Sequence, residues 1–440
     1  MGQRFAGKPP RFAALECVIH PLDCRATDTL RSRTPSLASI EHLRLGFVSG
    51  RAAHDNGHIW SDAGLGRLID ALRERAGSLT VALSASDEPL AHHEHRLSVE
   101  REAYIPLPPM PSYARGVRMG SRCRDGIRRV ESRSDVVVVQ LPFTAPTALF
   151  GAMRPRVYHV CADIRAIVST SPYYQGLLRL PVVAAAQLTH LMQRSLAAQP
   201  AARVVTNGAD LLSQFDPGRG RAVVSSSLYD REILSVPRQR SPDAPFRVLF
   251  VGFLRPEKGI DTLLAAFQRL LDEIPSAELF IVGAKAPVER GVSTELEQAL
   301  GALRERGTVH MAGFHGYGPE LFQAFADADV LAVPSRSEGT PRVLVEARAF
   351  GCTVVASNVG GIPTSIEHEV DGLLVPPGDA EALAAAFVRI ARDRALRKRL
   401  IAAGIERARR TTVDRFADSI IAEAHLAADA GARTARGTRN

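Results

Sequence analysis

Short runs of β-branched and apolar residues alternate with helix-period stretches from Phe246 onward, and this alternation constrains the fold more than any other feature of the sequence. Loops that carry Gly or Pro join the segments, a pattern typical of βαβ units in a parallel sheet. The predicted strands cover residues 246–251, 278–282, 308–312, 329–333, 353–356 and 372–375. Six strands in this pattern indicate a doubly wound domain.

The first half of the chain repeats the pattern less regularly. Its apolar runs cover residues 43–48, 79–83, 135–139, 157–160, 203–205 and 221–224. A chain of 440 residues is also longer than one hydrophobic core usually supports. We therefore predict an α/β protein with two Rossmann-like, doubly wound parallel-sheet domains. Because parallel strands present loops at their carboxyl ends, the two domains are expected to face each other across a ligand cleft.

Composition shifts set the predicted domain limits. Residues 236–245 are rich in Pro, Ser and charge, which indicates an exposed linker and a hinge. The remaining limits are 1–40 for a disordered extension, 41–238 for the N-terminal domain, 246–414 for the C-terminal domain and 429–440 for a flexible tail.

Cysteine usage and targeting signals favour a cytoplasmic protein. The five cysteines are scattered and form no C-x-x-C pair, which disfavours a disulfide framework and a zinc site. The histidines at 92, 93 and 95 also lack zinc-site spacing and are expected to be solvated. No apolar run reaches the roughly 20 residues of a membrane span, and residues 1–40 lack the apolar core of a secretory signal.

The charge balance favours anionic partners. The formal net charge is +8, mostly from arginines spread along the chain. Nucleic acid is not expected, because no basic run is interleaved with stacking aromatic residues. A nicotinamide or flavin enzyme is disfavoured as well, since residues 283–291 do not give the G-x-G-x-x-G fingerprint.

The most informative motif follows the predicted strand at 329–333. Thr340 suits the N-cap and Pro341 the first position of a helix, with Glu338 in the preceding loop and Glu346 inside the helix. Carboxylates accept paired hydrogen bonds from vicinal hydroxyls, while a helix start attracts phosphate. A nucleotide sugar fits this arrangement. The alternative is a surface helix in which Glu346 pairs with Arg342, four residues earlier.

Several motifs in order resemble the retaining GT-B glycosyltransferases of family four, also described as glycosyl transferases group 1. The resemblance rests on Glu338, Glu346 and the following Ala347, and on the segments 351–363 and 371–379. It covers about 170 residues, from Phe246 to about Arg415. It implies a GT-B fold whose N-terminal domain takes the acceptor and whose C-terminal domain takes the donor. A final helix at 415–428 would cross back to complete the N-terminal domain.

The resemblance also assigns roles in the C-terminal domain. It implies that Glu338 contacts the donor sugar and that Glu346 holds the ribose hydroxyls. Lys258, in the loop at 250–260, is a compact cation suited to a diphosphate, with ordinary solvated charge as the alternative. The family has an Arg directly after Gly252, where this chain has Phe253, so Arg255 is the candidate replacement. The full predicted donor-binding set is Gly252, Arg255, Gly339, Thr340 and Glu346, with Lys258 and Glu338 in catalysis.

Two further candidates lie in the first half. His159 follows an apolar strand and corresponds to the family's histidine near the reacting sugar; a hydrogen-bonded structural histidine is the alternative. Gly64 and Gly66 lie in the loop predicted between the first strand and first helix, where small residues let amides approach a phosphate. A plain structural loop is the alternative there. No metal ligand is predicted.

Together these features predict a retaining hexosyltransferase that uses a UDP- or GDP-linked sugar and a glycan or lipid-linked hydroxyl acceptor. Surface polysaccharide biosynthesis is the expected setting, and no metal or other cofactor is expected. Arginines on one face of residues 113–133 favour a solvated arginine face over a core contact, and peripheral contact with the inner face of the cell membrane is the alternative. The competing function is a catalytically silent subunit of GT-B fold that binds a sugar nucleotide or glycan.

Overall fold

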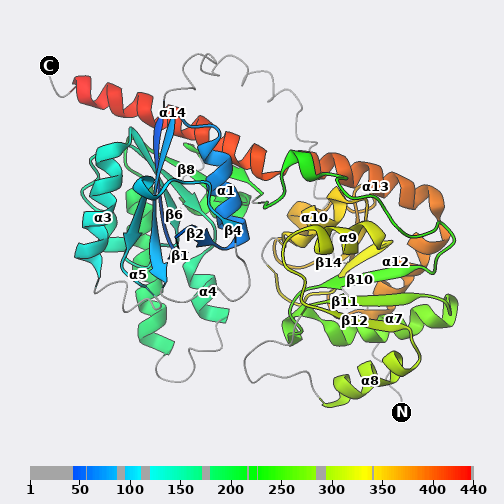
Figure 1. Ribbon diagram of the computed structural model, residues 1–440. Coiled ribbons are helices and arrows are strands. Elements are labelled where there is room, and N and C mark those ends of the chain that lie inside the picture. The colour runs from blue at the N-terminus through cyan, green and yellow to red at the C-terminus, as the bar shows by residue number, and fades with distance from the viewer. Residues whose placement is uncertain are drawn as a thin grey trace, which may run out of the picture. The chain divides into compact units, whose positions relative to one another are not determined.

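The computed structural model describes residues 43–55, 57–86, 95–110, 119–170, 179–215, 218–224, 226–283, 294–338 and 341–437. The expectation for residues 1–40 lies outside these ranges. Within them the chain forms two sheets, one of nine strands and one of six. Helices cover both faces of each sheet (Figure 1). The predicted α/β class with two Rossmann-like domains is therefore confirmed.

The nine-stranded sheet belongs to the first half of the chain. Its strands are β1 (Arg44–Asp55), β2 (Ile59–Ser61), β3 (Ser78–Ser86), β4 (His95–Arg96), β5 (Tyr104–Leu107), β6 (Val136–Leu141), β7 (Arg156–Val160), β8 (Ala202–Asn207) and β9 (Gly220–Val223). The order is β4-β2-β1-β6-β7-β8-β9, with β3 paired to β1 and β5. The strands are parallel except at β2, which runs antiparallel to β1 and β4.

Alternation along β1 divides the core of this sheet into two layers. Leu45 and Phe47 face one side, where α1 (Ala63–Arg73) and α14 (Val413–Gly437) pack. Val48 faces the other side. That side is covered by α3 (Gly120–Arg133), η5 (Pro146–Leu149), α5 (Arg179–Ala197) and α6 (Ala209–Phe215), with α4 (Ile164–Thr170) packed beside α5. Period-two patterning thus serves both faces of a buried sheet.

The six-stranded sheet is parallel throughout. Its strands are β10 (Arg247–Val251), β11 (Glu278–Val282), β12 (Val309–Gly313), β13 (Val330–Val333), β14 (Thr353–Ser357) and β15 (Leu373–Val375). The order β12-β11-β10-β13-β14-β15 reverses direction between β10 and β13. In open α/β sheets ligands bind at such a switch point, beyond the carboxyl ends of the strands.

Two sets of helices enclose this sheet. The helices of the second half are α7 (Ile260–Glu273), α8 (Thr294–Glu305), α9 (Pro319–Asp327), α10 (Val343–Ala349), α11 (Ile362–Ser365), α12 (Ala380–Arg392) and α13 (Arg394–Arg409). Residues of α7, α8 and α12 share one core cluster, and residues of α9, α10 and α11 share the other. None of the helices in the described ranges is long and apolar enough to cross a membrane.

The chain passes from one core to the other next to the start of α14. Leu228 belongs to a core cluster of the six-stranded sheet, whereas Tyr229 belongs to a cluster of the nine-stranded sheet. The amide of Val413 donates to the carbonyl of Leu228 at 2.8 Å, so the outgoing and returning segments lie together. Phe416 and Ile420 then bury α14 on the nine-stranded sheet, and this helix continues to Gly437, nine residues beyond the predicted end at 428.

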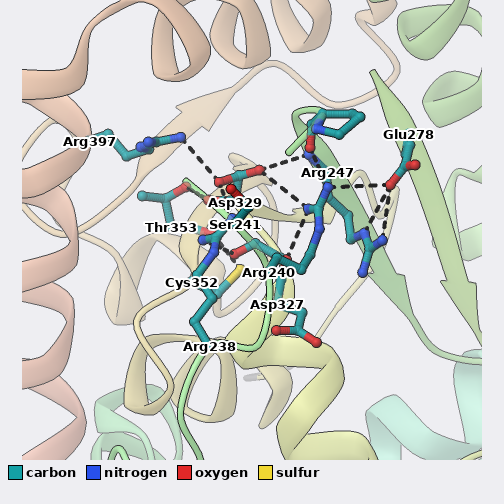
Figure 2. Close-up of polar contacts among 12 residues, drawn as sticks. Arg238, Arg240, Ser241, Arg247, Glu278, Asp327, Asp329, Cys352, Thr353 and Arg397 are labelled. Atoms are coloured by element: carbon teal, nitrogen blue, oxygen red, sulfur yellow. Dashed lines mark hydrogen bonds and ion pairs between the residues drawn. The ribbon is translucent and has the colours of Figure 1, made fainter. Parts of the chain in front are cut away.

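Residues 236–245, predicted as an exposed linker, are largely exposed and form ion pairs beside the six-stranded sheet. Figure 2 shows arginines of this segment directed at carboxylates of the six-stranded sheet. Arg238 binds Asp329 at 2.7 Å, and Arg240 lies 3.4 Å from Glu278 and 3.8 Å from Asp329. Asp329 is 5% exposed and also binds Arg397 at 3.1 Å. These ion pairs hold the segment against the sheet, a contact that composition alone did not indicate.

Candidate functional site

Loops from different strands meet at the switch point of the six-stranded sheet, and two glycines permit the approach. Gly259 has φ 68°, and a Cβ there would collide with the carbonyl oxygen of Pro334. Gly360 has φ 57°, and a Cβ there would collide with the carbonyl oxygen of Glu338. Positive φ is accessible to glycine at little cost. The loops after β10 and β14 therefore both press against the loop after β13.

Two residues predicted for catalysis meet at this junction. The Lys258 ammonium group donates to Glu338 Oε1, and the Ser335 hydroxyl donates to the same oxygen at 3.0 Å. The Lys258 side chain is 31% exposed and that of Glu338 13%. The cation is therefore accessible to an incoming anion, while the carboxylate is held in place from two sides. Such a pair offers a cation and a hydrogen-bond acceptor to one ligand.

An arginine fixes the loop that carries Glu338. Arg336 forms an ion pair with Asp261 at the start of α7, and its Nη1 donates to the carbonyl of Pro256 at 2.9 Å. Its backbone amide donates to the carbonyl of Glu257 at 2.8 Å. These bonds join the loop after β13 to the turn that carries Lys258. The geometry of the Lys258–Glu338 pair is thus set by backbone and ion-pair contacts on both sides.

Glu346 is a buried carboxyl group on α10, 5% exposed. Burial raises its pKa to about 7, while the guanidinium groups of Arg342 and Arg67 act in the opposite direction. No ion pair joins Glu346 to Arg342 in the described part of the chain, because Arg342 Nη1 donates to the Ser227 hydroxyl at 2.9 Å instead. A carboxyl group of this kind, with a raised pKa and no bonded cation, is typical of a functional site.

The start of α10 differs from the sequence prediction. The helix begins at Val343 with Arg342 as its N-cap, so Pro341 is not its first helical residue. Gly339 and Thr340 lie outside the described residues. Glu346 is consequently in the first turn, and the helix has only seven residues, too few for a large macrodipole.

Sequence reasoning missed a group of residues that surrounds Glu346. The Arg67 guanidinium lies over the rings of Tyr229 and Tyr317, 4.3 and 5.0 Å from their centroids, and it binds Glu232. The Tyr317 hydroxyl is buried and has no hydrogen-bond partner among the residues that the structure describes. Burial and the charge of Glu346 both raise the pKa of Tyr317, so its hydroxyl stays protonated. Arg67 occupies an unremarkable helix position, and no local pattern points to Tyr317.

Arg255 and Gly252, both predicted to bind the donor, contact other parts of the protein in this structure. The Arg255 guanidinium lies 5.3 Å from the ring centroid of Phe253 and 3.9 Å from Glu257, with its side chain 47% exposed. The backbone amide of Gly252 donates to the carbonyl of Val282 at 2.9 Å. Gly252 therefore extends the pairing of β10 with β11. Arg255 remains accessible at the edge of the loop that carries Lys258.

His159, predicted near the reacting sugar, is a buried residue close to the end of β7. It lies within β7, is 2% exposed, and packs against the ring of Phe416 with centroids 4.8 Å apart. The thiol of Cys161 lies 3.4 Å from its Nε2. Burial, with a smaller contribution from Arg51, lowers the pKa of His159 to about 3. Its imidazole is therefore neutral and shielded, because α14 covers this side of β7.

Gly64 and Gly66 lie inside α1, and the loop predicted there is largely β1, β2 and the helix itself. The amide of Gly66 donates to the carbonyl of Asp62 at 2.8 Å, so it is not free for a phosphate. A Cβ at Gly66 would collide with His95, whose Nε2 lies 2.8 Å from Asp70; this histidine is therefore a packing residue. Gly64 instead makes room for the Arg342 guanidinium, which lies against its Cα.

Comparison with known proteins finds a family match that includes the site described above. The family described as glycosyl transferases group 1 matches residues 234–407, which contain the Lys258–Glu338 pair and Glu346. The match covers part of the chain, and its residues comprise the six-stranded sheet and most of the helices of that sheet.

Curated proteins similar to this chain are D-inositol 3-phosphate glycosyltransferases. The protein of Saccharomonospora viridis is 34% identical over 247 residues, which cover 55% of this chain and 54% of that protein. The protein of Actinosynnema mirum is 35% identical over 247 residues, which cover 54% of each. The chain thus spans about half the length of the curated relatives it matches.

Solved structures establish the fold of the chain. Anabaena HepE in complex with UDP aligns with a TM-score of 0.58 at 22% identity, covering 84% of this chain and 96% of HepE. WaaG, a glycosyltransferase involved in lipopolysaccharide biosynthesis, aligns with a TM-score of 0.58 at 16% identity, covering 86% and 99%. The predicted GT-B fold is therefore confirmed, and the alignments extend over both sheets.

Proposed function

We propose that this chain transfers a hexosyl group from a nucleotide diphosphate sugar to an acceptor hydroxyl, with retention of anomeric configuration. The observation that carries the proposal is the Lys258–Glu338 pair, held at the switch point of the donor-domain sheet. The family match over residues 234–407 and the two HepE structures, in complex with UDP and UDP-glucose, support a nucleotide-sugar donor. UDP- and GDP-linked sugars are the proposed donors.

The two residues of the pair act on different parts of the donor. The accessible Lys258 ammonium leaves Glu338 to contact the diphosphate, where negative charge grows as the anomeric bond breaks. Glu338, still bonded to Ser335, accepts hydrogen bonds from hexose hydroxyls. The acceptor attacks from the face that the nucleotide leaves, and a donor phosphate oxygen takes the acceptor proton. No enzyme nucleophile and no resident metal take part in this proposal.

Glu346 and its neighbours hold the nucleoside. Its buried carboxylate accepts the two ribose hydroxyls, and a carboxylate can take two such donors at once. Arg255, at the edge of the Lys258 loop, is the second proposed cation for the diphosphate. The acceptor is proposed to be a glycan or a lipid-linked hydroxyl at the cytoplasmic side of a membrane, in polysaccharide biosynthesis. Inositol phosphate is a further acceptor to test, given the names of the curated relatives.

A catalytically silent sugar-nucleotide or glycan-binding subunit is the second candidate function. It is favoured by Phe253, which stands where the family resemblance expects an arginine and lies beside the Arg255 guanidinium. The buried His159 points the same way, because it leaves no exposed histidine on β7.

Release of nucleoside diphosphate distinguishes the two functions. Purified protein is incubated with UDP-, GDP- and ADP-linked hexoses, with and without acceptor, and a Lys258→Ala variant serves as control. The transferase proposal predicts release from one donor that the variant lacks, with the product anomer retained by NMR. A donor that raises the melting temperature but is never consumed would favour the silent subunit; a ligand at 100 times its Kd stabilises by about 2.7 kcal/mol.

A further inference from the structure

One face of the nine-stranded sheet carries an outer layer with unusual surface chemistry. The layer consists of α3, the segment 146–154 and α5, and is called here the α3–α5 layer (Figure 1). Its inner side is core, since Ile127 of α3, Leu149 and Leu196 of α5 share one buried cluster. Arg124 of α3 donates to the carbonyl of Thr147 at 2.7 Å, which joins the helix to the segment. The layer is therefore continuous across the sheet.

Large apolar side chains gather on the outside of this layer. Of the nine exposed large hydrophobic side chains in the described ranges, six belong to it. They are Phe150, Met153, Leu180, Val183, Leu188 and Leu191, exposed by 39% to 72%. Those on α5 recur at helical spacing and form a single stripe, opposite the buried Ala186, Thr189 and Gln193. A monomeric soluble protein rarely keeps such a stripe without a partner.

The layer also exposes arginines, and it contains few carboxylates. The exposed arginines of the layer are Arg122, Arg128, Arg129, Arg133, Arg154, Arg179 and Arg194. α5 and the segment 146–154 contain no acidic residue. α3 contains Asp125, which is exposed, and Glu131, which is buried in an ion pair with Arg156 at 2.8 Å. The exposed side of the layer therefore combines an apolar stripe on α5 with seven exposed arginines and little negative charge.

We propose that the α3–α5 layer docks the protein on an anionic lipid surface. Apolar side chains at helical spacing enter the headgroup boundary, while arginines around them meet lipid phosphates, which is the arrangement of interfacial helices. A second copy of this chain is a poorer occupant, because self-association would bring the same arginines against each other. The contact is peripheral, since no described helix qualifies as a membrane span. It takes up the membrane alternative for residues 113–133, of which 113–118 lie outside the described residues.

Vesicle co-sedimentation of the full chain tests the proposal. We expect binding to phosphatidylcholine vesicles with about 30% phosphatidylserine or phosphatidylglycerol, much weaker binding to neutral vesicles, and loss of binding in high salt. Replacing the exposed pair Leu188→Gln and Leu191→Gln is expected to weaken binding at least about 10-fold, because their apolar contact is lost. Arg128→Gln with Arg194→Gln is expected to weaken it by roughly 25-fold, about 5-fold for each arginine.

Matched variants on the other sheet control for general charge and hydrophobicity. Val370 is 43% exposed, and Arg304 and Arg306 are exposed near the end of α8. Val370→Gln and the Arg304→Gln, Arg306→Gln pair are expected to bind vesicles like the wild type. Thermal melting checks that every variant is folded. Wild-type protein that stays in the supernatant, or layer variants that bind like these controls, would refute the proposal. So would layer variants that only split a dimer, measured by light scattering.

Discussion

The buried carboxyl group of Glu346 is expected to make donor binding depend on pH. Burial raises its pKa to about 7, so both protonation states are populated near neutrality. The ionised group accepts hydrogen bonds only, which suits two ribose hydroxyls, whereas protonation replaces one acceptor site by a donor. Because the donor binds the ionised form better, its affinity is expected to rise as the pH increases through the pKa.

The magnitude follows from the ionised fraction. With a pKa of about 7, Glu346 is roughly 10% ionised at pH 6 and roughly 90% ionised at pH 8. If only the ionised form binds well, the donor Kd falls by up to about 10-fold between these values. Glu346→Gln keeps the shape and one acceptor but cannot ionise. Its affinity is expected to be flat across this range and about 10-fold or more below that of wild type at pH 8.

Isothermal titration calorimetry with UDP-glucose or GDP-mannose measures this dependence directly. A nucleotide sugar is preferred over a free diphosphate, because its phosphates do not change charge between pH 6 and 8. The Gln variant separates Glu346 from other titrating groups. Equal Kd values for the wild type at both ends of the range would refute the reasoning. A slope that persists unchanged in the variant would assign the dependence to another residue.

Three substitutions test other parts of the structure. Lys258→Ala is expected to lower kcat/KM for transfer by at least ~100-fold, about 2.7 kcal/mol, and near wild-type turnover in a coupled nucleotide-release assay would remove its phosphate role. Gly259→Ala is expected to lower the free energy of unfolding by at least about 2 kcal/mol, because its Cβ would strike the Pro334 carbonyl at positive φ; unchanged urea unfolding would contradict this. Asp329→Asn is expected to cost roughly 1–2 kcal/mol, since the arginines it binds, Arg238 among them, are partly exposed and screened; a stability equal to wild type would show that segment 236–245 is held by other contacts.

The sheets were predictable because their signals are local. β11 covers residues 278–282, which is the predicted range. Each of the other strands of that sheet begins and ends within about two residues of its own predicted range. Apolar runs bounded by Gly and Pro suffice for this, since a parallel strand is buried on both faces. The short strands β2, β4 and β5 were missed, because each has only two to four residues. Strands of this length contain too few residues to show the two-residue alternation of apolar and polar side chains that identifies a strand.

The surroundings of each site residue were less predictable, because they depend on distant segments. His159 has an ordinary strand-end pattern, and its burial is decided by Phe416 of α14, more than 250 residues later. Residues 236–245 contain no local pattern that pairs their arginines with a carboxylate. The partner of Arg238 is Asp329, which lies directly before β13 and about 90 residues later in the chain. Lys258 and Glu338 come together because the sheet order reverses between β10 and β13, which follows from the predicted topology. The roles assigned to these residues remain predictions.

A crystal structure of the full chain with a bound nucleotide sugar tests the central claim most directly. The account predicts that the Lys258 ammonium has moved from Glu338 to the diphosphate, with the hexose hydroxyls on Glu338 and the ribose hydroxyls on Glu346. A donor bound elsewhere, or one bound while Lys258 still pairs with Glu338 and Glu346 contacts no hydroxyl, would contradict it.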